Sequence, residues 1–190
     1  MSATLGPIHQ RMFEKAVAVD GLARAIAAHA DEMGWTSGHA AALDAAYPPL
    51  AGEIVDHIDL GQIHASLNVL VNSSENALAA AVEPLESHRS EVRAFAEQLG
   101  FAAGFAHRGD DLQQVWDVMD QAWLDGMPCD GFVSFDENRT DCICWTVALD
   151  PHPANGYAEL RAAWLRGFCR AASIDFETIA DGTFQIRKAA

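Results

Sequence analysis

The pattern of apolar residues changes once along this chain of 190 residues, at Gly126-Met127-Pro128-Cys129-Asp130-Gly131. Before this segment, apolar side chains recur at helical spacing in alanine-rich stretches. After it, two stretches alternate as paired strands do, and one strong helical pattern separates them. This change predicts an α+β fold, in which an N-terminal helical layer is followed by a small antiparallel β-sheet at the C-terminal end.

Length and composition favour one domain over two. Half of the residues are apolar, which is enough to build a hydrophobic core. The roughly sixty residues after the change would form only a thin core alone. We therefore expect a single α+β domain over residues 1–190, with a helical portion at 1–126 and a hairpin-helix-hairpin portion at 131–190 packed on it.

The helical portion divides at its capping and breaking residues. The spacing predicts a helix from Pro7 to Gly34, a short one over 38–46 and a helix over 50–72, although the end of the last segment, at 67–71, could instead be a strand. The cluster Asn72-Ser73-Ser74 is typical of a cap for the next helix, which runs to about Val82. A further helix is predicted up to about Ala106, and in it Gly100-Phe-Ala-Ala-Gly104 indicates close helix packing in the core.

The most clearly marked helix precedes the change. Asp111 and Gln114 form a capping-box pattern, and apolar residues through Trp116 to Trp123 lie on one face. Beyond the change, the alternation predicts a hairpin over 132–149, a helix over 155–172 and a second hairpin around Ala180-Asp181-Gly182. We expect the tryptophan-bearing helix to pack on this sheet.

Charge excludes some classes of partner. The chain has 12 Lys and Arg against 27 Asp and Glu, a net charge of −15. Phosphate groups would be repelled, so we expect no nucleic-acid and no membrane partner. The alternative to an ordinary acidic surface is a face for a basic protein, which would involve Asp110, Asp111, Asp117, Asp120, Asp125 and Asp130.

The N-terminal sequence lacks the basic and apolar regions of a signal peptide, and no apolar run is long enough to span a bilayer. A cytoplasmic location is therefore expected. The four cysteines would then be reduced, and by default they are small buried residues. Cys142 and Cys144 would share one face of a strand, without the Cys-x-x-Cys spacing of a zinc site.

A metal site is one candidate for function. On a continuous helix, Glu53, His57 and His64 would lie on one side, and these ligand types suit zinc or iron. Half-buried histidines with ordinary hydrogen bonds are the competing interpretation. His88 and His107 are candidates for a general base, although the sequence fixes no partner for either. No nucleotide-binding loop occurs, and no cofactor is evident.

A second candidate is an aromatic pocket between the tryptophan-bearing helix and the sheet. Arg166 would anchor an acidic group there, because guanidinium groups bind carboxylate and phosphate well. The competing interpretation is that the aromatic residues fill the core and that Arg166 and Arg170 are solvated and balance Glu159 and Asp175. The residues expected to line this pocket are Trp116, Trp123, Trp145, Trp164 and Phe168.

The layout of the last third resembles the C-terminal half of 4-vinyl reductase-type domains. It consists of the hairpin at 132–149, the helix containing Trp164-Leu-Arg-Gly-Phe168, and the strand with Phe184-Gln-Ile186. The resemblance implies a small-molecule-binding module. The family often has cysteines in its closing strands, where this chain has Thr178, Ile179 and Thr183, which argues against a cysteine-based metal role here.

Three hypotheses for function remain open. The first is a non-catalytic small-molecule-binding or regulatory module that forms a homodimer. The second is a small enzyme, either hydrolase-like or metal-dependent through Glu53, His57 and His64. The third is an acidic helical adaptor for a basic protein.

Overall fold

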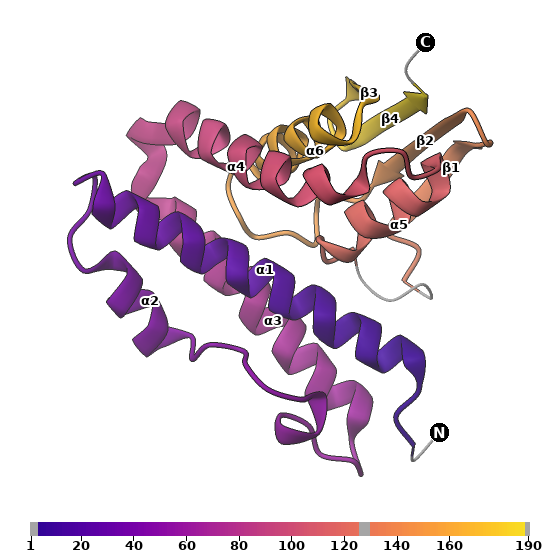
Figure 1. The fold of residues 1–190 in the computed structure, drawn as a ribbon. Coiled ribbons are helices and arrows are strands. Elements are labelled where there is room, and N and C mark those ends of the chain that lie inside the picture. The colour runs from indigo at the N-terminus through magenta and orange to yellow at the C-terminus, as the bar shows by residue number, and fades with distance from the viewer. Residues whose placement is uncertain (1–3, 126–129, 189–190) are drawn as a thin grey trace. The chain divides into compact units, whose positions relative to one another are not determined.

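The computed structural model describes residues 4–125 and 130–188. Helices form the chain as far as Gln121, and a four-stranded antiparallel sheet with one further helix follows (Figure 1). This order confirms the predicted α+β class. Residues 126–129, in which the apolar pattern changes and which include Cys129, lie outside the described residues.

The chain divides into two compact units that interleave in sequence. Unit 1 consists of residues 1–86, 121–124 and 153–155, and unit 2 consists of residues 87–120, 125–152 and 156–190. The helices from residue 87 onward therefore group with the sheet rather than with the first helices. The division falls near Glu86, about forty residues before the change in the apolar pattern.

Unit 1 is built on two long helices, α1 (Pro7–Glu32) and α3 (Ile63–Val82), which pack side by side (Figure 1). As predicted, α1 has Pro7 in its first turn, and Gly34 follows it in the left-handed conformation with φ of +70°. A shorter helix, α2 (His39–Ala46), also confirms its prediction. Apolar side chains on α1 and α3 form the core of this unit, among them Phe13, Val19, Ile26, Leu67 and Leu78.

The predicted helix over 50–72 is wrong before Ile63 and confirmed from Ile63 onward. Residues 54–56 form only a short 3₁₀ turn, η1 (Ile54–Asp56), and α3 begins at Ile63. A local turn intervenes, in which the Gly61 amide donates to the Asp59 carboxylate at 2.8 Å. The predicted cap at 72–74 is wrong as well, because α3 continues through it and buries Ser74 completely.

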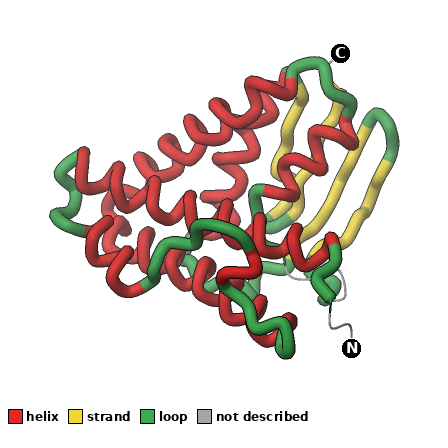
Figure 2. The backbone as a smooth tube through the Cα atoms, turned by 60° about the horizontal axis from the view of Figure 1, so that its bottom comes forward, coloured by secondary structure: helices red, strands yellow, loops and turns green. Residues whose placement is uncertain are grey.

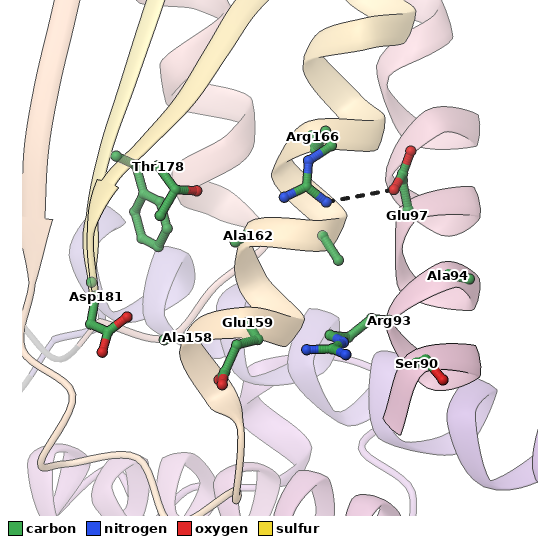
Figure 3. Close-up of a pocket in the computed structure, with 13 residues that line it drawn as sticks. Ser90, Arg93, Ala94, Glu97, Ala158, Glu159, Ala162, Arg166, Thr178 and Asp181 are labelled. Carbon is green, nitrogen blue, oxygen red and sulfur yellow. Dashed lines mark ion pairs between the residues drawn. The ribbon is translucent and has the colours of Figure 1, made fainter. Parts of the chain in front are cut away.

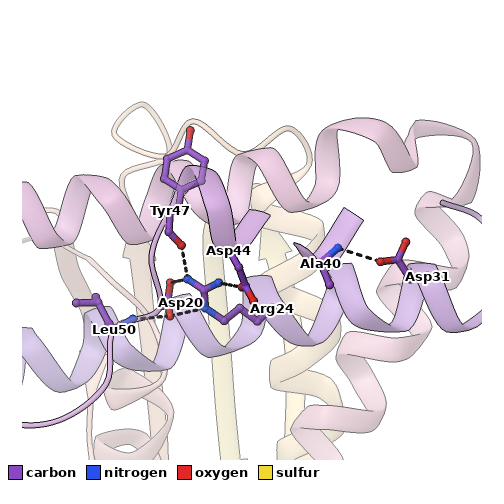
Figure 4. Close-up of polar contacts among 7 residues, drawn as sticks. All are labelled: Asp20, Arg24, Asp31, Ala40, Asp44, Tyr47 and Leu50. Carbon is purple, nitrogen blue, oxygen red and sulfur yellow. Dashed lines mark hydrogen bonds and ion pairs between the residues drawn. The ribbon is translucent and has the colours of Figure 1, made fainter. Parts of the chain in front are cut away.

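Polar side chains on α1 fix the segment that follows it in unit 1 (Figure 4). Both oxygens of the buried Asp20 carboxylate accept hydrogen bonds from Arg24, and one also accepts from the Leu50 amide at 3.2 Å. Arg24 also donates to the Tyr47 carbonyl at 2.7 Å and pairs with Asp44. Because the buried charges are paired, this cluster is a structural tie between α1 and the chain at 44–50.

Asp31 has a similar role at the penultimate residue of α1. Its carboxylate accepts from the amides of His39 and Ala40, at 3.0 and 2.9 Å, and from the Thr36 hydroxyl at 2.8 Å. These donors lower the pKa of Asp31, with the Ala40 amide making the largest contribution. The carboxylate therefore acts as the N-terminal cap of α2, whose own preceding residue is a glycine.

Unit 2 contains a sheet with strand order β1-β2-β4-β3, shown in yellow in Figure 2. Its strands are β1 (Val133–Asn138), β2 (Cys142–Val147), β3 (Ile174–Ala180) and β4 (Thr183–Lys188). Both predicted hairpins are confirmed. The helix between them, α6 (Tyr157–Ala172), is also as predicted.

The remaining helices of unit 2 are α4 (Arg89–Gly104) and α5 (Leu112–Gln121), flanked by the 3₁₀ turns η2 (Glu83–His88) and η3 (Phe105–His107). The capping box of α5 is confirmed by reciprocal hydrogen bonds of 2.9 Å between Asp111 and Gln114. The helix ends at Gln121, before Trp123. Trp116 contacts the sheet, with its ring centroid 5.0 Å from that of Phe135 on β1.

Helices α4 and α6 approach each other at backbone distance. A Cβ atom on Gly100 would lie 2.0 Å from the Trp164 carbonyl oxygen, and one on Gly104 would lie 2.3 Å from the Phe168 carbonyl oxygen. This confirms the predicted close packing at these glycines. The contacts advance in the same direction along both helices, so α4 and α6 run parallel and begin at the same end of the unit.

Candidate functional site

A pocket of about 420 Å³ lies in unit 2 where α4, α6 and the β3–β4 hairpin meet (Figure 3). Ser90, Arg93, Ala94 and Glu97 come from α4, and Ala158, Glu159 and Arg166 come from the facing side of α6. Thr178, Asp181 and Gly182 come from the hairpin. The volume is typical of a site for a small molecule.

The parallel packing of α4 and α6 positions the charged residues at one end of this pocket. Arg166 and Arg170 project from α6 towards the Glu97 carboxylate on α4. The Nη1 atom of Arg166 is 3.6 Å from Glu97 Oε2, and the Nη1 atom of Arg170 is 2.5 Å from Oε1. The close approach at Gly100 and Gly104 brings these side chains within reach, and both oxygens of Glu97 are engaged.

Three other charged side chains of the pocket are not paired. Arg93 on α4, Glu159 in the first turn of α6 and Asp181 in the hairpin turn all line the pocket. Across residues 4–125 and 130–188, none of the three forms a hydrogen bond or ion pair. The pocket therefore presents charge of both signs that the protein itself does not neutralise.

The floor of the pocket is apolar, and the hairpin wall beside it is closely packed against the sheet. Phe184 is fully buried and Ala163 is 3% exposed, so the lining between the charged groups is hydrocarbon. Gly182 holds the hairpin turn against the sheet, with φ of +73° and a carbonyl that accepts from the Val147 amide at 2.8 Å. A Cβ atom on Gly182 would lie 2.7 Å from the Val147 carbonyl oxygen, so this wall requires glycine.

The structure separates the aromatic residues that the sequence placed around one pocket. Trp116 and Trp145 lie together beside Arg161 and Asp125, in a space too narrow to hold a water molecule. Trp164 and Phe168 stack on each other on α6, with ring centroids 5.3 Å apart. Trp123 belongs to unit 1 and is completely buried.

Arg166 lies in the pocket described above rather than beside the tryptophans. The buried arginine near Trp116 and Trp145 is instead Arg161, which is paired with Asp125 through both carboxylate oxygens, one contact being 2.8 Å. Burial opposes the charge of Arg161, but the Asp125 carboxylate outweighs it, and the pKa of Arg161 is raised. This pair belongs to the core of unit 2.

The proposed metal ligands do not share a helix. Glu53 precedes the short 3₁₀ turn, and His57 follows it and donates from Nε2 to the Ala51 carbonyl oxygen at 2.7 Å. His64 lies in the first turn of α3. The spacing argument required one continuous helix, which does not form. Among the described residues, no group of three or more His, Cys, Asp or Glu side chains is arranged to hold a metal ion.

The cysteines within the described residues, Cys142, Cys144 and Cys169, are buried free thiols, as expected. Burial raises the pKa of Cys169 to about 12. Burial also raises the pKa of Cys142 and Cys144, with a further contribution from Glu137 and Asp136 respectively. The thiols are therefore held in the protonated, weakly nucleophilic form.

His107 at the end of η3 is hydrogen-bonded through Nδ1 to the Asp110 carboxylate at 2.9 Å, and its ring stacks on Phe168. A carboxylate on Nδ1 orients a histidine as in a general base. In the part of the chain that the structure describes, His107 has no hydrogen bond to a hydroxyl or thiol nucleophile.

The expected acidic face near α5 is partly occupied by internal contacts. Asp125 is buried against Arg161, Asp110 is bonded to His107, and Asp111 caps α5. No helix among the described residues has the length and apolar character needed to cross a membrane.

Comparison with models of known protein families, with curated proteins and with solved structures found no match to this chain. The resemblance to 4-vinyl reductase-type domains therefore remains a prediction.

Sequence reasoning identified Arg166 but missed Arg93, Glu97, Glu159 and Asp181 as neighbours in one site. Glycines at 100, 104 and 167 are the signal that could have located Glu97. They allow the backbones of α4 and α6 to come into contact. Their parallel direction, which brings both helix starts to the hairpin turn, is not visible in the sequence.

Proposed function

We propose that this protein is a small-molecule-binding or regulatory module and that its ligand occupies the pocket between α4, α6 and the β3–β4 turn. The observation that carries the proposal is the presence of three unpaired charged side chains, Arg93, Glu159 and Asp181, around an apolar floor. A cavity with hydrocarbon lining and a few polar groups is the usual form of a ligand site.

Neighbouring charges support this interpretation. Glu97 forms ion pairs with Arg166 and Arg170, and the buried Arg161 is paired with Asp125. Arg93, Glu159 and Asp181 thus stay unpaired although Glu97 and Arg166 in the same lining are paired. We infer that the free charges are left for a ligand, which would replace water around them.

We also propose a cytoplasmic location, as expected from the sequence. The free thiols at Cys142, Cys144 and Cys169 suit the reducing cytoplasm. A homodimer remains part of the proposal, and size measurement in solution tests it separately from ligand binding.

The test is a ligand screen with a variant that fills the pocket. Ala94 lines the pocket from the exposed side of α4, and a leucine there keeps the helix while occupying the space. Ala102→Leu, at an exposed position on the same helix outside the pocket, is the matched control.

The ¹⁵N-labelled protein is titrated with a library of amino acids, carboxylic acids, amines and phosphate esters. We expect at least one class to shift the amide signals of pocket residues, with affinity reduced about tenfold or more in Ala94→Leu and unchanged in Ala102→Leu. Absence of any shift at the pocket, or equal binding by both variants, would contradict the proposal.

A further inference from the structure

The unpaired charges of the pocket are segregated by sign. Arg93 projects from α4, whereas Glu159 and Asp181 lie on α6 and the hairpin turn (Figure 3). The space between them is bounded by alanine side chains and Phe184. A ligand in this space meets a positive group on one wall and negative groups on the other.

The arrangement of the helices explains why Arg93 has no internal partner. Its natural partner on α4 is Glu97, four residues later on the same face. Both oxygens of Glu97 are engaged by Arg166 and Arg170 of α6. The guanidinium group of Arg93 is therefore left facing the pocket.

Glu159 is unpaired for a related reason. Positions three and four residues later on α6 are Ala162 and Ala163, so its own helix offers no basic partner. Asp181 occupies the tip of the β3–β4 turn, where Gly182 fixes the backbone against Val147.

We propose that the ligand is a small zwitterion, in which an anionic group binds Arg93 and a primary ammonium group binds Glu159 and Asp181. This inference rests on the proposed function, because it assigns the ligand class of the same pocket. The charged lining consists of Arg93 and Arg166 against Glu97, Glu159 and Asp181, which disfavours a ligand of high negative charge.

Ligands with one charge leave part of this lining without a partner. A simple carboxylate would lie close to two unneutralised carboxylates, and a simple amine would leave Arg93 unpaired. A zwitterion satisfies both walls and brings no net charge. The alanine walls and the volume of about 420 Å³ suit a molecule of amino-acid or dipeptide size.

The experiment compares molecules that differ only in their charged ends. The zwitterions are β-alanine, 4-aminobutyrate, 6-aminohexanoate and glycylglycine, and 4-aminobutyrate is matched by butyrate and butylamine. Binding to the full chain is measured by calorimetry and by NMR shifts of pocket amides near pH 7. We expect at least one zwitterion to bind about tenfold more tightly than its single-charge counterparts, a modest factor because the charged groups are exposed.

Variants that remove charge from the pocket show where each charged end of the ligand binds. Arg93→Gln should remove the preference for the zwitterion over the amine, and Glu159→Gln with Asp181→Asn should remove its preference over the carboxylate. Arg139→Gln and Glu177→Gln carry the same changes outside the pocket and should bind as the unaltered protein does.

Equal binding of a zwitterion and its single-charge counterpart would overturn the inference, as would failure of every zwitterion to bind. If a library compound still shifts the pocket amides in that case, the pocket remains a ligand site with a different specificity. If no library compound does so, the proposed function fails together with the inference.

Discussion

A Cβ atom on Gly167 of α6 would lie 1.9 Å from the carbonyl oxygen of Glu97 on α4. No side-chain rotation can relieve such an overlap, because both groups belong to helix backbones. At Gly167 the backbones of α4 and α6, which form two walls of the pocket, are therefore in direct contact.

We expect Gly167→Ala to lower the free energy of unfolding by about 3 kcal/mol or more, since α4 and α6 must separate. Urea unfolding followed by circular dichroism measures this change. Gly21→Ala in α1 is the control, because its added Cβ meets nothing within 4 Å and alanine favours the helix. A loss below about 1 kcal/mol in Gly167→Ala would show that the helices do not touch here.

The buried pair of Asp125 and Arg161 gives a second prediction. Asp125→Asn leaves a guanidinium group without its counter-charge in the core, and we expect a loss of about 3–5 kcal/mol. Asp125→Leu combined with Arg161→Met removes both charges and should cost less than Asp125→Asn. Asp117→Asn on the exposed side of α5 should change stability by less than about 0.5 kcal/mol.

The Cys169 thiol predicts a dependence of stability on alkaline pH. Burial raises its pKa from the ordinary 9.0 to about 12, so the unfolded chain releases this proton at lower pH than the folded one. The stability due to the protonated thiol is complete below pH 9 and is lost as pH rises towards 12.

The unfolding free energy should therefore fall more steeply between pH 9 and 10.5 in the unaltered protein than in Cys169→Ala, by about 1 kcal/mol per pH unit. Denaturant unfolding at several pH values measures both slopes. Identical slopes in the two proteins would mean that Cys169 ionises equally in the folded and unfolded states.

Asp31 predicts the opposite dependence at acid pH. Hydrogen bonds from the Ala40 and His39 amides lower its pKa below the ordinary 3.8, so the cap is complete above that value and is lost as pH falls through the lower, folded pKa. Hydrogen exchange of the amides in α2 should speed up in Asp31→Ala near neutral pH. Glu32→Ala, at the exposed neighbouring position, should leave exchange in α2 unchanged.

Local signals in the sequence predicted several elements because local interactions stabilise them. The hairpins follow from strict alternation around Asp181-Gly182, and α5 begins where Asp111 and Gln114 can bond reciprocally. The helix predicted over 50–62 does not form, although the apolar spacing there is helical. The Asp59 carboxylate accepts a hydrogen bond from the Gly61 amide, which favours a turn. The cap predicted at Ser74 does not form, because burial of α3 in the core outweighs the capping preference of serine.

The candidate site was only partly predictable. Arg166 was identified because it is one of few basic residues, but its neighbours Arg93 and Glu97 lie about seventy residues earlier. Their meeting depends on the direction in which α4 and α6 pack. Composition likewise gave no means of separating tryptophans that fill the core, such as Trp145, from residues that line a pocket.

The interleaving of the two units restricts how this protein can be dissected. The chain returns to unit 1 at 121–124 and again at 153–155, after it has entered unit 2. A fragment that stops at Glu86 lacks Trp123, Leu124 and Ala154, all of which are buried. No single cut therefore yields an intact half, and a nascent chain can complete unit 1 only after residue 155 has been synthesised, when most of unit 2 already exists.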